Sequence, residues 1–167
     1  MNKTKFHGDT VHLVGNVPEA GSKAPDFTYV KGDLSEGSLK DLGDKKKIII
    51  SVPSLDTGVC QTETKRFNEE LSKRDDVVGL VVSKDLPFAM KRFCTAAGVE
   101  NVKIGSDFRG DFTKKYNTEM SDGPLKGLSS RAVFVLDKNN NITYTELVNE
   151  VTEEPNYDAV LKAVDEI

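Results

Sequence analysis

The sequence predicts an α/β protein with a central mixed β-sheet and helices on both of its faces. Two near-continuous runs rich in β-branched residues, 46–52 (KKIIISV) and 77–83 (VVGLVVS), have the composition of strands that are buried on both faces. The segment between them, residues 58–73, has the length and polarity of a helix. This order forms a βαβ unit, whose crossover is expected to be right-handed.

The residues before this unit are expected to be extended. Residues 4–17 alternate weakly in polarity and contain Gly8-Asp9, a turn signal, so they predict a small N-terminal β-hairpin. Pro25 biases the residue before it away from helix, and it therefore predicts an extended stretch that begins at residues 23–27.

The residues after the βαβ unit continue the pattern. Residues 86–97 predict a second helix, with Asp85 as its cap, and residues 108–116 predict a third. Residues 131–137 and 141–148 flank a turn-rich connection and predict two antiparallel neighbours.

A closing helix follows Pro155, because an apolar stripe recurs there at helical spacing. Two βα units, an antiparallel pair and a closing helix follow the order of the thioredoxin-like fold. Since no repeat, low-complexity tract or Pro/Ser-rich linker interrupts the chain, residues 1–167 are expected to form a single domain. The apolar stripe of the closing helix comprises Tyr157, Val160, Leu161 and Val164.

The composition argues against several classes of function. The chain has 23 Lys and Arg against 27 Asp and Glu, a net charge of −4, and no basic block that could neutralise nucleic-acid phosphates. No apolar run approaches the roughly 18 residues of a membrane span, or the roughly 7–15 residues at the centre of a secretory signal. We therefore expect a cytoplasmic protein that binds neither nucleic acid nor membrane.

The two cysteines, Cys60 and Cys94, limit the chemistry further. They are too few for a disulfide-stapled scaffold, and they do not form a CxxC pair. With His7 and His12 they lack the spacing of a zinc site. They are either inert core residues or a redox pair.

Cys60 begins the apolar stripe of the predicted helix. At about 100° per residue, Thr64, Phe67 and Leu71 lie within about 40° of it. In the first helical turn, unpaired N–H groups and the helix dipole stabilise a thiolate, although a buried core cysteine would fit the same periodicity. Thr57, three residues earlier, can cap this helix, turn its hydroxyl toward the sulfur, or do both.

Cys94 lies on the shoulder of its helix stripe, at about 80° from the start of the stripe. That position suits a reactive thiol, and it equally suits a residue that fills the core. Nothing in the two stripes aims the thiols at each other, so we expect the sulfurs of the reduced protein to be too far apart to bond. Oxidation is then expected to unwind a helical turn, more around Cys60, because Gly58 loosens it. The stripe of this second helix comprises Leu86, Met90, Phe93 and Ala97.

The pattern PxxxTxxC, formed by Pro53, Thr57 and Cys60 between a strand and a helix, resembles the active-site motif of the peroxiredoxins. The strings PSLDTGVC, DLPFAMKRFC, DGPLKGLSSRAV and EPNY are similar to the thiol peroxidase branch, the atypical 2-Cys peroxiredoxins. This resemblance covers nearly the whole chain.

The resemblance implies a role for each of these residues. Cys60 would be the peroxidatic nucleophile, Thr57 and Arg131 would activate the thiolate and the peroxide, and Pro53 would shield the sulfur. Cys94 would resolve the Cys60 sulfenic acid as an intrachain disulfide, which thioredoxin or a similar dithiol would reduce. The family implies an antioxidant homodimer that reduces hydrogen peroxide and organic hydroperoxides without metal, haem or flavin.

Two other functions are compatible with the same residues. A non-catalytic peroxide sensor would use the same cysteines without sustained turnover. A thioredoxin-fold interaction module would carry two inert cysteines. The Gly/Pro-punctuated loop of residues 123–128, just before Arg131, is expected to border the active site or a homodimer contact.

Overall fold

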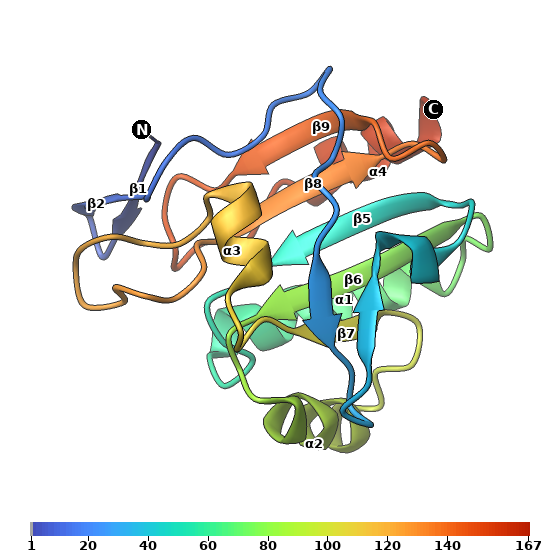
Figure 1. Cartoon of the computed structure of the whole chain (residues 1–167), viewed down its shortest axis with the longest axis horizontal. Coiled ribbons are helices and arrows are strands. Elements are labelled where there is room, and N and C mark those ends of the chain that lie inside the picture. Colours follow the sequence, from blue (N-terminus) through green and yellow to red (C-terminus); the bar gives the residue numbers. More distant parts are fainter. Residues whose placement is uncertain (1) are drawn as a thin grey trace.

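The computed structural model describes residues 2–167, and its central element is a seven-stranded mixed β-sheet (Figure 1). The three middle strands are parallel, and the strands on either side of them are antiparallel to their neighbours. In spatial order the strands are β4 (Glu36–Ser38), β3 (Thr28–Val30), β7 (Lys103–Ser106), β6 (Val77–Ser83), β5 (Lys46–Ser51), β8 (Ala132–Leu136) and β9 (Ile142–Leu147).

Helices cover both faces of the sheet, which confirms the predicted fold class. Three helices pack on one face, and a shorter helix and a 3₁₀ turn pack on the other, as the hydrophobic cores on these two faces show. On the first face lie α1 (Gly58–Leu71), α2 (Pro87–Ala97) and α4 (Tyr157–Asp165), and on the second lie α3 (Asp111–Tyr116) and η1 (Leu39–Leu42).

The central strand β5 shows why both faces are buried. Ile48 and Ile50 belong to the core beneath α1 and α4, whereas Ile49 belongs to the core on the α3 side. All three are completely buried, so the continuous apolar run meets two cores with its alternating side chains.

The predicted N-terminal hairpin is present and separate from the main sheet. Its strands are β1 (Lys3–Phe6) and β2 (Asp9–His12). The turn lies at His7-Gly8, one residue earlier than the sequence signal, and both residues have positive φ values of 51° and 86°. Two central residues with positive φ are what a tight hairpin turn requires.

Asp85 does not cap α2, contrary to the sequence prediction. Leu86 is the N-cap residue and Pro87 begins the helix, without a side-chain cap. The Asp85 carboxylate instead accepts hydrogen bonds from Ser83 and from the loop before α1, so both of its oxygens are already engaged. Leu86 is 53% exposed and therefore does not belong to the core stripe.

Two other boundaries differ from the prediction. The third helix begins at Asp111 rather than at residue 108, since Gly110 adopts a left-handed conformation just before it. Asp107 accepts hydrogen bonds from the backbone of Phe112 and Thr113 and so holds the first turn. Arg131 lies one residue before β8, which places it at the sheet edge rather than inside the strand.

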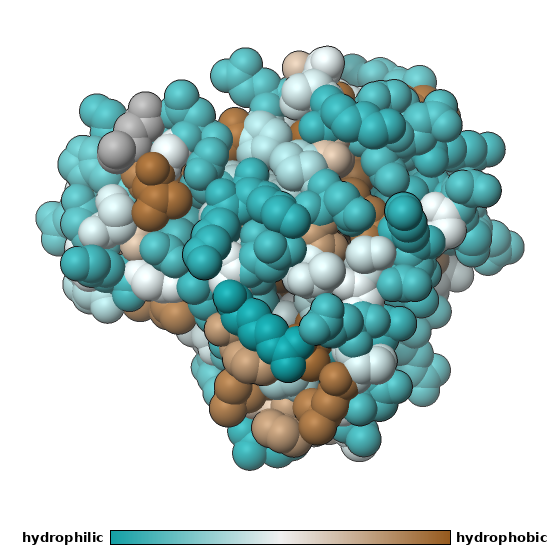
Figure 2. Space-filling view, in the orientation of Figure 1, coloured by the Kyte–Doolittle hydropathy of each residue, from teal (hydrophilic) through white to brown (hydrophobic). Residues whose placement is uncertain are grey.

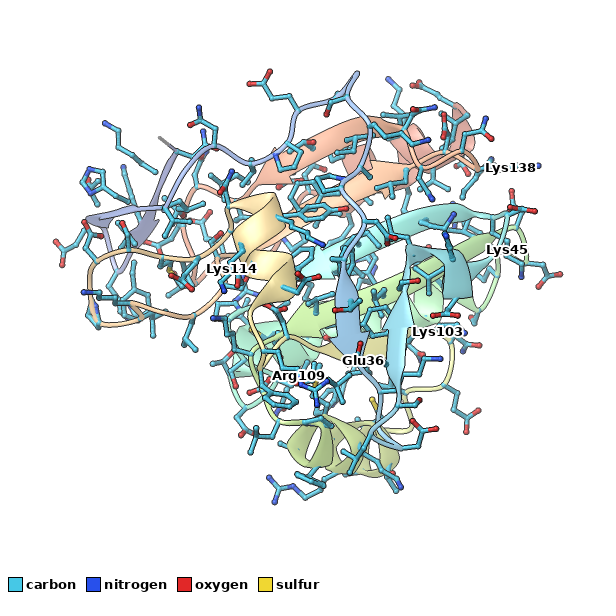
Figure 3. All side chains as sticks on the ribbon, in the orientation of Figure 1. Glu36, Lys45, Lys103, Arg109, Lys114 and Lys138 are labelled. Carbon is cyan, nitrogen blue, oxygen red and sulfur yellow. The ribbon has the colours of Figure 1, made fainter. Side chains whose placement is uncertain are left out.

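The short strands β3, β4 and β7 were not predicted as separate elements. The outer strand β4 is tied to the loop after β7 by an ion pair between Glu36 and Arg109 at 2.8 Å, and Figure 3 shows these side chains meeting. Among residues 2–167, no helix is both long and apolar enough to cross a membrane.

Candidate active site

The site lies where the parallel strands β5 and β6 end. In open α/β sheets, reactive groups collect at the carboxyl ends of such strands. The loop from Val52 to Thr57 leads from β5 to α1. Asp85, just after β6, holds this loop in place: the Asp85 carboxylate accepts hydrogen bonds from the Ser54 hydroxyl and from the Leu55 N–H, both at 2.7 Å.

Thr57 is the N-cap of α1, as predicted. Its backbone is extended, and its Oγ1 accepts a hydrogen bond from the Cys60 N–H at 3.4 Å. The same hydroxyl donates to the Ser54 carbonyl oxygen at 3.0 Å. The hydroxyl thus bonds to the backbone on both sides and sets the shape of the turn that carries Cys60.

Cys60 lies in the first turn of α1 and is completely buried. Thr64, Phe67 and Leu71 are buried on the same face, which confirms the predicted stripe. Its sulfur therefore faces the interior, near the positive end of the helix, where a negative charge is stabilised.

Arg131 lies beside this sulfur, and its guanidinium is held on three sides. Nη2 donates to Cys60 Sγ at 3.3 Å, Nη1 donates to Glu63 Oε1 at 2.7 Å, and Nε donates to the Val151 carbonyl oxygen at 2.9 Å. The side chain is only 2% exposed. A planar, fixed donor of this kind can stabilise a thiolate and a second anionic oxygen that develops next to it.

Glu63 was missed by the sequence analysis. It lies one turn after Cys60, so both are on one side of α1, and its side chain is completely buried. The available signal was its position beside the apolar stripe. It was passed over because a glutamate on a polar helix is ordinarily solvated.

Burial and charge act against each other in this pair. Burial raises the pKa of Glu63 to about 7, although the neighbouring Arg131 lowers it. Burial also works against the charge of Arg131, but the Cys60 sulfur and the Glu63 carboxylate together raise its pKa above the ordinary value. Arg131 therefore stays charged in the interior.

A cavity of about 170 Å³ opens above the guanidinium. Pro53, Thr57 and Arg131 all line it, and two of these predicted site residues, Thr57 and Arg131, also hydrogen-bond to Cys60. The loop of residues 123–128 also borders the cavity, through Leu125 and Leu128. The apolar part of the lining comprises Phe6, Val59, Leu125, Leu128 and Val151.

Cys94 lies on α2 and is half-buried. It packs against the same hydrophobic core that contains Cys60, and burial raises the pKa of its thiol. Both cysteines are free thiols. Within residues 2–167, no group of three or more His, Cys, Asp or Glu side chains is arranged to hold a metal ion.

The chain is similar to known proteins along nearly its whole length. The Redoxin family model matches residues 19–161. Curated thiol peroxidases are similar over nearly their full length. The protein from Leptospira interrogans is 53% identical over 166 residues (98% of this chain, 97% of the relative). The protein from Aquifex aeolicus is 47% identical over 160 residues (96% and 95%).

Solved structures show the same fold. The crystal structure of a peroxiredoxin-like protein from Aquifex aeolicus has a TM-score of 0.93 and 45% identity, covering 99% of this chain and 97% of that one. A thiol peroxidase from Chromobacterium violaceum has a TM-score of 0.88 and 25% identity, covering 98% and 95%. The chain therefore belongs to the redoxin family and, within it, to the thiol peroxidases, peroxiredoxin-type oxidoreductases that reduce peroxides with a thiol.

Proposed function

We propose that Cys60 is the peroxidatic nucleophile of this thiol peroxidase. Its thiolate attacks one peroxide oxygen, so that an S–O bond forms, the O–O bond breaks and a sulfenic acid results. The leaving alkoxide takes a proton and departs as an alcohol, or, with hydrogen peroxide, the leaving hydroxide takes a proton and departs as water. The observation that carries the proposal is the 3.3 Å contact between Arg131 Nη2 and Cys60 Sγ, at the N-terminus of α1 and next to the cavity that Arg131 lines.

Thr57 and Pro53 complete the reaction site. Thr57 orients the turn that holds the thiolate and presents its hydroxyl at the cavity wall, and Pro53 limits the access of water. Arg131 stabilises both the thiolate and the charge that develops on the leaving oxygen. No metal, haem or flavin takes part, because the sulfur itself is oxidised and reduced.

Cys94 is proposed as the resolving cysteine. Its thiol condenses with the Cys60 sulfenic acid, water leaves, and an intrachain Cys60–Cys94 disulfide forms. Thioredoxin or a similar dithiol then reduces this disulfide by exchange. The half-buried position of Cys94 in the core that also contains Cys60 supports this role, since opening of the helix that carries Cys94 would bring its thiol toward the site.

The cavity lining favours organic hydroperoxides as substrates beside hydrogen peroxide. Phe6, Leu125 and Leu128 make its wall mainly apolar, and such a wall removes an alkyl group from water. Phe6→Ser and Leu128→Ser are therefore expected to raise KM for cumene hydroperoxide more than for hydrogen peroxide. Equal effects on both substrates would argue against this assignment.

A cytoplasmic homodimer is proposed as the working form. Apolar side chains gather on the surface over α2 (Figure 2), and Leu86, Phe88 and Phe108 are 53%, 64% and 42% exposed. A hydrogen bond from Ser106 to the Asp85 carbonyl oxygen joins the two segments that carry them. A second copy would bury this apolar surface. Sedimentation of wild type and Phe88→Ser tests the dimer.

Mass spectrometry after one equivalent of peroxide tests the chemistry. The wild type is expected to form an intrachain Cys60–Cys94 disulfide. Cys60→Ser should consume no peroxide, and Cys94→Ser should react once and accumulate sulfenic or over-oxidised Cys60. Full thioredoxin-dependent turnover by Cys94→Ser would show that another group resolves the sulfenic acid.

A further inference from the structure

Glu63 and Arg131 form an ion pair in the interior, beside the reactive sulfur. Their side chains are 0% and 2% exposed, and the Oε1–Nη1 distance is 2.7 Å. A carboxylate buried this deeply is costly unless its lone pairs are satisfied by donors. The pair therefore needs an explanation beyond general stability, because an apolar pair of the same volume would usually be no less stable.

The guanidinium faces two groups that can both carry a negative charge. Nη1 donates to Glu63, and Nη2 donates to the Cys60 sulfur at 3.3 Å. When only one of the two is ionised, the three groups together are neutral. When both are ionised, the cluster carries a net negative charge in the interior, which is the more costly state.

The second oxygen of Glu63 points to the state that the protein favours. Among the described residues, Oε2 is buried without a hydrogen-bond partner. An ionised carboxylate loses more from a missing donor than a neutral acid does. In agreement, burial raises the pKa of Glu63 to about 7 despite the opposing effect of Arg131.

The nearby carboxylates also raise the pKa of Glu63, and so they too favour its neutral form. Glu154, before α4, and Glu146, on β9, both raise the pKa of Glu63. Glu63 in turn raises the pKa of the Tyr157 phenol on α4. Arg131 is thus the positive group that opposes two carboxylates, Glu146 and Glu154.

We infer that Glu63 is a positioning residue that shares one proton with Cys60 across Arg131. The pair Cys60–SH with Glu63–COO⁻ and the pair Cys60–S⁻ with Glu63–COOH hold the same number of protons, and each is neutral together with Arg131. In the second arrangement the whole charge of Arg131 serves the thiolate and the departing oxygen. This inference rests on Cys60 being the nucleophile, as proposed above.

The consequence is a rate that falls at high pH. When Glu63 loses its proton, Arg131 is divided between two anions, and its support for the leaving oxygen weakens. Between about pH 6 and about pH 8, the rate of the wild type with peroxide should decline by about tenfold, because with a pKa of about 7 the protonated fraction of Glu63 falls by about that factor over this range. Two coupled titrations should be visible, since the sites interact.

The experiment compares Glu63→Gln with wild type and with Glu69→Gln, a change at an exposed glutamate of the same helix. Glutamine keeps the shape of Glu63 and an oxygen for Arg131, but it cannot ionise. The readouts are the pH profile of the single-turnover reaction with hydrogen peroxide and that of Cys60 alkylation by iodoacetamide. Glu63→Gln should show one titration without the decline, and Glu69→Gln should follow the wild type.

A Glu63→Gln profile superimposable on that of the wild type would overturn the inference, and so would a uniform loss at every pH, which indicates only a structural role. Should the variant fail to fold, isotope-edited NMR of the glutamate carboxyl carbons in the wild type replaces it. The Glu63 carboxyl should then titrate differently before and after alkylation of Cys60, and an unchanged titration contradicts the inference. The proposed function is tested separately: if Cys60→Ser kept peroxide turnover, Cys60 would not be the nucleophile. The alkylation profile of Cys60 involves no peroxide, so it tests the role of Glu63 independently of that outcome.

Discussion

The carboxylate of Asp85 accepts a hydrogen bond from the backbone N–H of Leu55 at 2.7 Å, and a second from the Ser54 hydroxyl at the same distance. Asp85 immediately precedes Leu86, the N-cap of α2. One side chain thus connects the loop that presents Cys60 to the start of the helix that carries Cys94.

Asp85→Ala is expected to loosen this loop. The buried Leu55 N–H loses its acceptor, so the free energy of unfolding should fall by about 1–3 kcal/mol. The reaction of Cys60 with peroxide should slow as well, because the turn before it is no longer held. Denaturant unfolding and stopped-flow kinetics measure the two effects. Asp56→Ala, an exposed position in the same loop, is the control and should change neither.

Arg131→Met should slow the attack of Cys60 by about 10²–10³-fold, the usual cost of removing one preorganised donor. The structure adds a consequence that the sequence did not indicate. The change removes the donor to Glu63 Oε1 and leaves that buried carboxyl group without a hydrogen-bond partner, so the free energy of unfolding should also fall, by about 1–3 kcal/mol.

The double variant Arg131→Met/Glu63→Gln separates these two effects. At a pH where Glu63 ionises, stability should largely return, because glutamine cannot carry a buried charge, whereas the peroxide reaction should stay slow. A double variant with wild-type kinetics would remove Arg131 from the reaction site.

Thr57→Val removes the hydroxyl that caps α1 while keeping the side-chain volume. Loss of the cap should lower the free energy of unfolding by about 0.5–2 kcal/mol. Alkylation of Cys60 at neutral pH should slow, since the turn that orients its sulfur is less well held. Thr57→Ser keeps a hydroxyl and should restore both properties, and equal behaviour of the two variants would contradict the role of the hydroxyl.

Oxidation should unwind α2 more than α1. The sequence suggested the reverse, because Gly58 precedes Cys60. In the structure, α1 buries five side chains, Cys60, Glu63, Thr64, Phe67 and Leu71, whereas α2 buries only Pro87 and Met90. The less anchored segment is cheaper to open. Hydrogen exchange of the disulfide form should show loss of protection mainly in residues 87–97, and greater loss in residues 58–71 would contradict this.

The stability of the protein should decrease as the pH rises toward about 8, through Glu63. Its pKa of about 7 in the folded state exceeds its ordinary 4.5, so the folded state binds more protons between these values. The contribution of Glu63 to the free energy of unfolding is therefore greatest below about pH 4.5. It is lost as the pH rises through about 7, and the loss is at most about 3 kcal/mol.

Glu63→Gln isolates this contribution from the other titrating groups. The difference in the free energy of unfolding between Glu63→Gln and wild type should grow from about pH 5 to about pH 8, as urea titrations at each pH can measure. Glu69→Gln should show a constant difference. A constant difference for Glu63→Gln would mean that Glu63 ionises equally in the folded and unfolded states.

Local sequence patterns were sufficient for the central part of the fold. Three features depend only on neighbours in the chain and were predicted correctly. They are the continuous apolar runs of β5 and β6, the helical stripe from Cys60 to Leu71, and the turn-rich connection between β8 and β9. The short strands β3, β4 and β7 were not, because three or four residues carry too little periodicity, and they are strands through pairing with distant partners.

The partners of the charged side chains were decided by the tertiary structure alone. Asp85 has the local pattern of a helix cap, yet it bonds to a loop 30 residues away, where the ends of β5 and β6 meet. Glu63 has the pattern of a solvated helix residue, yet it is buried because Arg131, 68 residues later, reaches it across the sheet edge. The sequence by itself determined which thiol begins a helix and which motif surrounds it. Which charge lies beside that thiol depends on long-range packing, since a short-range pattern carries no information about groups that only the fold brings into contact.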